Sequence, residues 1–265
     1  MKLGCQTYTW EMRLAERPTS LWAMFDAIAA AGYDGVEFTT VTGAEWLREP
    51  ARVKEELKGR GLQLAAVAAV GHGFTDPDDL TEDLATVQTV VRLLHHFPGA
   101  VLALAGAAHP DTGHWRLHLD HAIRFYRVCH HTAADLGVPC AVHPHSHHGS
   151  LLETQEQYDY LFEHLPEGAG WCPDTGHILR GGQDLFACLD RYAPRIAYLH
   201  LKDVDAAGEW QPLGQGVVDL PKLIGRLRAR GFDGWLVAEE ESAFAREDPV
   251  RAITENLRTV RKDAS

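Results

Sequence analysis

The sequence predicts an α/β protein, a (β/α)8 TIM barrel that forms a single domain over residues 1–265. Short apolar runs alternate eight times with longer amphipathic runs, and this alternation calls for a parallel sheet. The repeats are spaced by about 33 residues, the length of a strand and helix in such barrels. No change in composition divides the chain. An open doubly wound sheet is the alternative, but no glycine-rich phosphate loop follows the first apolar run.

Each repeat has signals that bound its elements. Gly32 is expected to end the first helix, Pro50 suits a first helical turn, and Thr154 with Gln157 forms a capping box. The expected strands cover residues 2–7, 35–38, 62–70, 100–105, 140–143, 170–173, 196–201 and 235–239. The expected helices begin at residue 19 or 20, cover 50–59, follow Pro77 as far as Pro98, cover 112–136, 154–166, 184–192 and 221–230, and begin again at 249. The glycine-rich stretch 205–219 is a candidate lid.

Charge and cysteine content limit the partners and the compartment. The net charge of −12 weighs against a nucleic acid or an anionic membrane as the partner. The five cysteines are scattered and odd in number, which favours free thiols in a reducing compartment. No secretory signal or membrane-spanning stretch is evident, so a cytoplasmic protein is expected, and homo-oligomer formation is left open.

Nearly every expected strand ends on a side chain that can bind a metal or transfer a proton. Barrel active sites are built at these carboxyl ends. The fifth strand leads into the densest group, with four histidines in six residues. In chain order the strand-end residues are Glu37, His72, His109, His143 with His145, Asp174 with His177, His200 and Glu239.

Four of these residues form a plausible set of metal ligands: His143, Asp174, His200 and Glu239. Two imidazoles and two carboxylates suit one divalent ion, with Mn²⁺ preferred and Co²⁺, Zn²⁺ or Mg²⁺ as alternatives. The competing interpretation is that Asp174 caps the following helix and that His200 is an interior histidine. Spacing alone leaves open whether His143 or His145 is the ligand from the fifth strand.

The motifs around these residues resemble the xylose isomerase-like sugar isomerase/epimerase superfamily, and within it the inosose dehydratase type. They are residues 142–145 (VHPH), 173–177 (PDTGH), 199–203 (LHLKD) and 234–239 (GWLVAE). The resemblance covers the whole chain and implies a metal-dependent barrel with these four ligands and with His177 touching substrate oxygens. Many ketose 3-epimerases of the superfamily carry a glutamate at the end of strand five. His143 stands there instead, which favours a dehydratase-like enzyme.

The chemistry that such a site supports is proton abstraction beside the carbonyl of a keto-sugar or inosose, through an enediolate. Glu239 is the first candidate for the base, with His145 and His177 as alternatives, and Lys202 could neutralise the intermediate. Glu37, His72, His109 and His177 are expected to bind the substrate. The outcome could be isomerisation, epimerisation or dehydration, or β-elimination from a keto-glycoside. An unphosphorylated small molecule is preferred, because no phosphate cradle is evident.

Two other classes of function compete with this enzyme. A DNA-repair nuclease of the endonuclease IV type would share the barrel and many of the histidines. Its Asp-x-His motif is missing, since Gly208 and Trp210 stand where those ligands would be, before the turn at 213–216. A catalytically silent binding protein is the other alternative, and the array of potential ligands at the strand ends argues against it.

Overall fold

The computed structural model describes residues 1–76 and 80–263. Two compact units make up the chain: Met1–Ala65 with Tyr198–Ser265, and Ala66–Ala197. All eight strands expected from the sequence are found among the described residues. Pro77, the expected start of the third helix, lies outside them.

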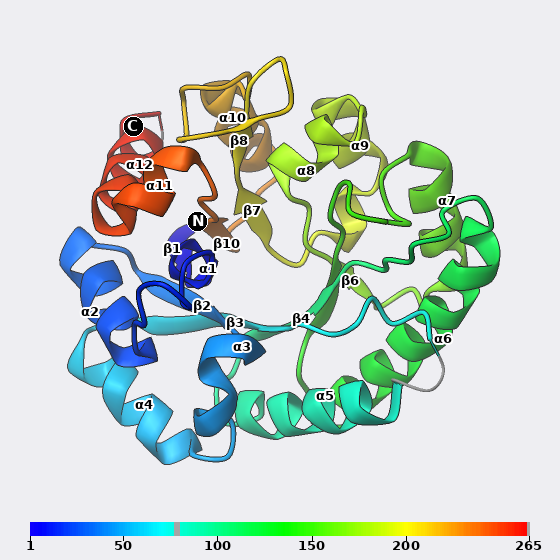
Figure 1. Cartoon of the computed structure of the whole chain (residues 1–265), viewed down its shortest axis with the longest axis horizontal. Helices are drawn as coiled ribbons and strands as arrows, with labels where there is room; N and C mark the ends of the chain where they lie inside the picture. Colours follow the sequence, from blue (N-terminus) through cyan, green and yellow to red (C-terminus); the bar gives the residue numbers. More distant parts are fainter. Residues whose placement is uncertain (77–79, 264–265) are drawn as a thin grey trace. The chain divides into compact units, whose positions relative to one another are not determined.

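The first unit contains four parallel strands in the order β2, β1, β10, β7 (Figure 1). In this register Gln6 lies beside Glu37, and Ala238 lies beside Leu201. The carboxyl ends of the four strands therefore meet at one edge. The strands are β1 (Lys2–Gln6), β2 (Gly35–Thr39), β7 (Leu199–Leu201) and β10 (Trp235–Ala238).

The helices of the first unit come from both ends of the chain. They are α1 (Tyr8–Glu11), α2 (Leu21–Ala31), α3 (Thr40–Gly43), the 3-10 turn η1 (Ala44–Trp46), α4 (Pro50–Gly59), α10 (Leu220–Ala229), α11 (Ala243–Glu247) and α12 (Pro249–Asp263). The Ser20 hydroxyl caps α2, and Gly32 ends it at φ +100°, where a side chain would be strained. Helix α12 packs beside α2 (Figure 1), and the Tyr33 hydroxyl donates to the Ile253 carbonyl at 2.8 Å.

The second unit repeats the plan with parallel pairing from β3 through β4 and β5 to β6. Strand β3 begins in the first unit, and Ala105 at the end of β4 pairs with His143 at the end of β5. The strands are β3 (Gln63–Ala69), β4 (Val101–Ala105), β5 (Cys140–His143) and β6 (Gly170–Trp171). The helices are α5 (Leu80–Leu94), α6 (Trp115–Ala134), α7 (Gln155–His164), α8 (Thr175–Arg180), α9 (Leu185–Arg191) and the turn η2 (Ala193–Arg195). Helices α5 and α6 pack side by side, α5 on β4 and α6 on β5 (Figure 1).

Some elements differ from the sequence-based expectation. The capping box of Thr154 and Gln157 is confirmed at the start of α7. Strand β6 is shorter than expected because Pro173 has no amide hydrogen to donate to a neighbouring strand. Helix α8, which begins directly after Asp174, was not among the expected helices and agrees only with the competing interpretation of Asp174 as a helix cap. The stretch 205–219 contains part of a small hairpin formed by β8 (Asp203–Val204) and β9 (Trp210–Gln211).

Two expectations about the chain as a whole can be compared with the structure. All five cysteines are buried and carry free thiols, as expected. Among the described residues, no helix is both long enough and apolar enough to cross a membrane.

Candidate metal centre and active site

His200 lies at the centre of a buried charged network in the first unit. Its Nδ1 is 2.6 Å from Glu239 Oε2, and its Nε2 is 2.8 Å from Glu37 Oε2. The side chains of His200 and Glu37 are fully buried, and that of Glu239 is 5% exposed. Gln6 Nε2 donates to the other oxygen of Glu37 at 3.3 Å. Protein groups thus contact both oxygens of Glu37, and one carboxylate lies on each side of the His200 ring.

Lys202 brings a buried positive charge to the same network. Its Nζ donates to Glu239 Oε1 at 3.0 Å and also to Glu241, and it lies 4.5 Å from the ring centroid of Trp210. Burial raises the pKa of Glu241 to about 7, although the nearby Lys202 acts in the opposite direction. From the sequence, strand alternation points Glu241 the same way as Glu239, which makes it a candidate to support the site from behind the ligands.

The stretch predicted as a lid is fastened by Asp203. Its buried carboxylate accepts hydrogen bonds of 2.9–3.0 Å from the backbone amides of Val204, Gly214, Gly216 and Val218. Gly216 is required here, because a Cβ at this position would lie 2.3 Å from Asp203 Oδ1. The carboxylate therefore holds the loop that carries Trp210 against the end of β7.

The carboxylate of Glu11, also in the first unit, accepts hydrogen bonds from three threonine hydroxyl groups. Glu11 Oε1 accepts hydrogen bonds from Thr7, Thr39 and Thr42 at 3.0, 2.7 and 3.0 Å. Burial raises the pKa of Glu11, and the three hydroxyl hydrogen bonds oppose that shift. Glu11 therefore keeps its proton to higher pH than an exposed glutamate does.

His143 and Asp174 face each other in the second unit. His143 ends β5 and is buried, and its Nε2 lies 3.7 Å from Asp174 Oδ2. The other oxygen of Asp174 accepts the amide of His177 at 2.8 Å and so caps α8. The two interpretations of Asp174 from sequence are therefore compatible, because one oxygen caps the helix while the other faces His143. His145 is half-buried, and its ring centroid lies 4.6 Å from that of His143.

The protonation state of His177 follows from its contact with Ser146. The Ser146 amide, which can only donate, lies 2.9 Å from His177 Nδ1, and the Ser146 hydroxyl lies 2.8 Å from the same atom. Nδ1 must therefore accept, so the ring is neutral and its proton sits on Nε2. This tautomer makes Nε2 of His177 a hydrogen-bond donor.

The remaining histidines of the 143–148 stretch shape the loop after β5. His147 and His148 have positive φ angles of 62° and 51°, and Gly149 follows at 79°. His147 Nδ1 lies 2.9 Å from Glu153 Oε1, and the His147 amide donates to the same oxygen. The amide of His109 donates to the Gly149 carbonyl at 2.8 Å, which joins this loop to the loop after β4.

The two other histidines predicted to bind substrate lie in more open positions. The side chain of His72 is 67% exposed, and its Nδ1 is 3.7 Å from Asp83 Oδ1. His109 Nδ1 accepts the amide of Asp111 at 3.0 Å, and its ring stacks on His118. Within the second unit these histidines therefore contact neighbours other than the His143, Asp174 and His177 group.

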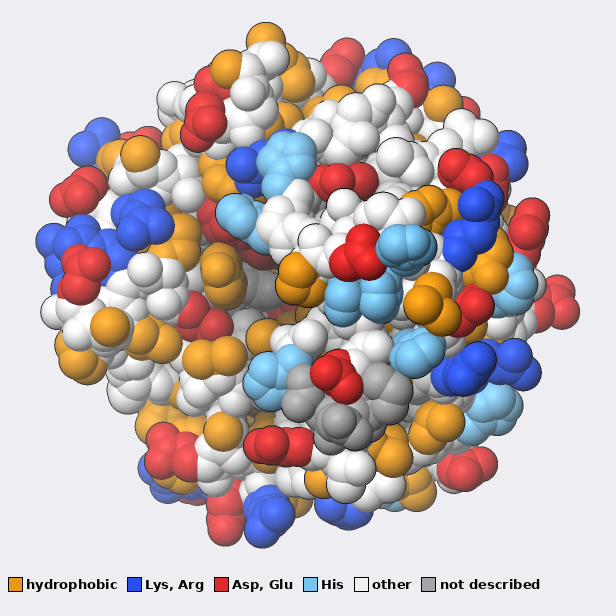
Figure 2. Space-filling view, turned by 45° about the vertical axis from the view of Figure 1, so that its right-hand side comes forward, with side chains coloured by type: hydrophobic (Ala, Val, Ile, Leu, Met, Phe, Trp, Pro, Cys, Tyr) orange, Lys and Arg blue, Asp and Glu red, His pale blue; other side chains and the backbone are white. Residues whose placement is uncertain are grey.

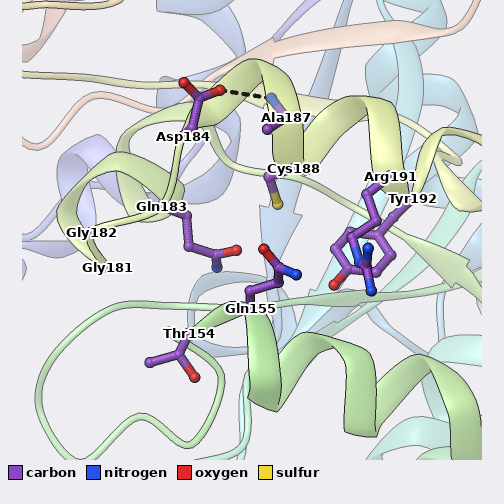
Figure 3. A pocket seen from close by; sticks show the side chains of 10 residues that line it. All are labelled: Thr154, Gln155, Gly181, Gly182, Gln183, Asp184, Ala187, Cys188, Arg191 and Tyr192. Carbon is purple, nitrogen blue, oxygen red and sulfur yellow. Dashed lines mark hydrogen bonds between the residues drawn. The ribbon is translucent and has the colours of Figure 1, made fainter.

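The second unit also contains a cavity away from the predicted residues. It measures about 270 Å³ and is lined by the start of α7 and by residues around α9. In Figure 3, Gln155 and Gln183 point toward each other across it, and Arg191 and Tyr192 lie to one side. Arg191 donates from Nε and from one terminal nitrogen to the two oxygens of Asp159, at 2.7 and 2.9 Å. None of the predicted site residues lines this cavity.

Two curated relatives resemble the chain over most of its length. It is 27% identical to the inosose dehydratase of Geobacillus kaustophilus over 250 residues, covering 81% of this chain and 78% of that protein. It is 30% identical to the rhizopine catabolism protein MocC of Rhizobium meliloti, covering 84% of this chain and 75% of the relative.

A solved structure agrees on the fold. The crystal structure of the IolI protein with a bound zinc atom superposes with a TM-score of 0.79 at 17% identity, covering 99% of this chain and 96% of that one. The model of the xylose isomerase-like TIM barrel family matches residues 25–262. The predicted barrel fold is thereby confirmed, and the predicted sugar isomerase, epimerase or dehydratase agrees with the named relatives. The chain belongs to the xylose isomerase-like TIM barrel family.

Proposed function

We propose that this protein is a divalent-metal-dependent dehydratase that removes water from a keto-inositol or a similar unphosphorylated keto-polyol. The main structural support is the buried network in which His200 lies between Glu37 and Glu239 while Lys202 donates to Glu239. Burying several charged groups together costs desolvation free energy, and such clusters occur preferentially at functional sites. A named inosose dehydratase among the relatives supports the choice of substrate.

The metal ligands of this proposal are His200 and Glu239 of the first unit and His143 and Asp174 of the second. In each unit a ring nitrogen faces a carboxylate oxygen, at 2.6 Å for His200 and 3.7 Å for His143. Ligand atoms around one ion are separated by roughly 3 to 3.5 Å when each bond is about 2.0–2.2 Å. Both pairs fit this requirement after shifts of a few tenths of an ångström. The buried position of His143 at the end of β5 supports it over His145.

In this proposal Glu37 orients the His200 ring and does not bind the substrate. Histidines that bind metals usually donate their second N–H to a carboxylate, which fixes the tautomer and the orientation of the ring. Glu37 is placed for this at His200 Nε2, which leaves Nδ1 to face Glu239.

When bound, the divalent ion would polarise the substrate carbonyl and so lower the cost of removing the neighbouring proton. Glu239 is the base of the proposal, with His145 as the alternative. The proton leaves the carbon beside the carbonyl, and the electron pair that remains expels the hydroxyl group on the next carbon. That hydroxyl needs a proton to leave as water. His177 Nε2 carries a proton and Lys202 carries a positive charge, so both are suited to donate to substrate oxygens.

Dehydration is preferred to epimerisation because of the residue at the end of β5. An epimerase with two opposed carboxylates needs an acidic side chain there, whereas this chain has His143, with His145 following it. His72 and His109 remain candidates for the outer part of the substrate site.

The proposal is tested with 2-keto-myo-inositol as substrate and with metal analysis of the purified protein. We expect His200→Ala and Glu239→Gln to lose dehydration, and His200→Ala also to lose the bound ion. His96→Ala replaces an exposed histidine outside the network and serves as the control. Unchanged metal content and turnover in both network variants would rule the proposal out.

A further inference from the structure

A second cluster of potential metal ligands lies in the loop after β4 and the first turn of α6, apart from the residues used above. Asp111 Oδ2 is 2.8 Å from His114 Nδ1 and 3.6 Å from His118 Nε2. The other oxygen of Asp111 accepts the amides of Gly113 and His114, which fixes the carboxylate in place. Figure 2 shows histidine side chains, interspersed with acidic ones, gathered on one face of the molecule. One carboxylate oxygen is thus directed at two imidazoles.

The spacing of the two histidines matches that of a helical metal site. His114 is the N-cap residue of α6, and the amide of His118 bonds to the His114 carbonyl at 3.4 Å, so the two lie one turn apart. Histidines four residues apart on a helix are a recurrent zinc-binding pair. The side chain of His114 is 76% exposed, so its ring can rotate to present either nitrogen.

The distances from Asp111 to the two rings also suit an ion of the zinc class. Tetrahedral zinc with bonds of about 2.0–2.1 Å separates its ligand atoms by roughly 3.4 Å. The separations of Asp111 Oδ2 from the two rings, 2.8 and 3.6 Å, lie on either side of that value, and the exposed ring of His114 would have to turn to bring its nitrogen close to that of His118 as well.

His109 supports the site without being a ligand itself. Its ring stacks on that of His118 with centroids 3.4 Å apart and planes inclined by 15°. Its Nδ1 accepts the amide of Asp111. His109 therefore contacts two of the three candidate ligands and holds them in place.

We propose that Asp111, His114 and His118 form a second divalent-metal site, for Zn²⁺ or an ion of similar preference. Three protein ligands leave one tetrahedral position for water. The site would stiffen the loop after β4, which is joined to the loop after β5 through His109 and Gly149. It does not depend on the proposed catalytic function, because it shares no ligand with it.

Zinc binding to metal-free protein tests this site. Equilibrium dialysis against Zn²⁺, followed by metal analysis, should give one ion fewer per chain for the double variant His114→Ala, His118→Ala than for the unmodified chain. Asp111→Asn keeps the capping oxygen but removes the charge, and it should weaken this ion at least tenfold. The matched control is His95→Ala, His96→Ala, another histidine pair near a helix end, which should bind as many ions as the unmodified chain.

The comparison separates this site from the proposed catalytic one. In a chain that carries Glu239→Gln, replacing His114 and His118 should still remove one ion, whether or not the proposed catalytic site holds its own ion. Equal ion numbers in the unmodified chain and the His114, His118 double variant would overturn the proposal. Loss of the ion in the control pair alone would overturn it as well.

Discussion

Replacing Asp203 with asparagine should destabilise the fold far more than an isosteric change normally does. The carboxylate is buried and accepts four backbone amides, those of Val204, Gly214, Gly216 and Val218. An asparagine supplies only one acceptor oxygen. Its NH₂ group would face two of these amides, donor against donor.

The size of the effect follows from the hydrogen bonds that are lost. A hydrogen bond to a charged group contributes about 1.5–3 kcal/mol, so losing two predicts a decrease of about 3–6 kcal/mol in the free energy of unfolding. That is a large part of the roughly 5–15 kcal/mol typical of a folded domain. The loop that carries Trp210 depends on the same amides, so its contact with Lys202 should loosen as well.

Urea unfolding followed by tryptophan fluorescence measures this loss. The matched control is Asp205→Asn, two residues away. Asp205 Oδ1 accepts hydrogen bonds from the backbone amides of Ala207 and Glu209. Its other oxygen accepts from the side-chain amide of Gln211, which can rotate by about 180° and offer its oxygen to the NH₂ group of an asparagine. We expect a much smaller loss for this control. Equal stability of the two variants would refute the argument that Asp203 fastens the loop.

Three further predictions follow from individual contacts. Glu11→Gln should be more stable than the unmodified protein at pH 7 to 8. Burial raises the folded-state pKa of Glu11, so the folded state holds its proton longer, and stability falls as pH rises above the ordinary glutamate pKa of about 4.5. The advantage should disappear below that pH, and pH-dependent urea unfolding measures it. Long-range ¹H–¹⁵N NMR should find the His177 proton on Nε2, and a proton on Nδ1 would contradict the contact with Ser146. Thr154→Ala should cost about 1 kcal/mol in thermal unfolding, whereas an unchanged melting temperature would argue against the cap.

The fold could be predicted because its signals are local and repeated. Gly32 ends α2, and Thr154 begins α7 with its capping box, as expected. The apolar runs correspond to strands, since a parallel strand covered on both faces needs continuous apolar sequence. Helix α8 entered the sequence analysis only through the possible cap at Asp174, because its six residues are too few to show a helical period.

The site residues could be predicted, but not what each of them contacts. Counting strand ends identified His200 and Glu239, yet no sequence pattern could show that His200 lies against Glu37, which is 163 residues away. The tautomer of His177 depends on the backbone amide of Ser146, and this amide points at the histidine ring only in the folded loop. In the sequence Asp203 is only the last residue of the motif at 199–203. Its hydrogen bonds to amides of the segment Gly214–Val218 depend on how the loop folds back onto it.

The central claim is that this protein removes a proton beside the carbonyl of a keto-inositol with Glu239 as base. The most direct measurement incubates the Mn²⁺-loaded protein with 2-keto-myo-inositol in D₂O and analyses substrate and product by mass spectrometry. We predict a product that has lost one water, and deuterium in recovered substrate at the carbon beside the carbonyl, with both reduced at least about 100-fold in Glu239→Gln. Substrate recovered intact and without deuterium from protein that holds its ion would contradict the claim.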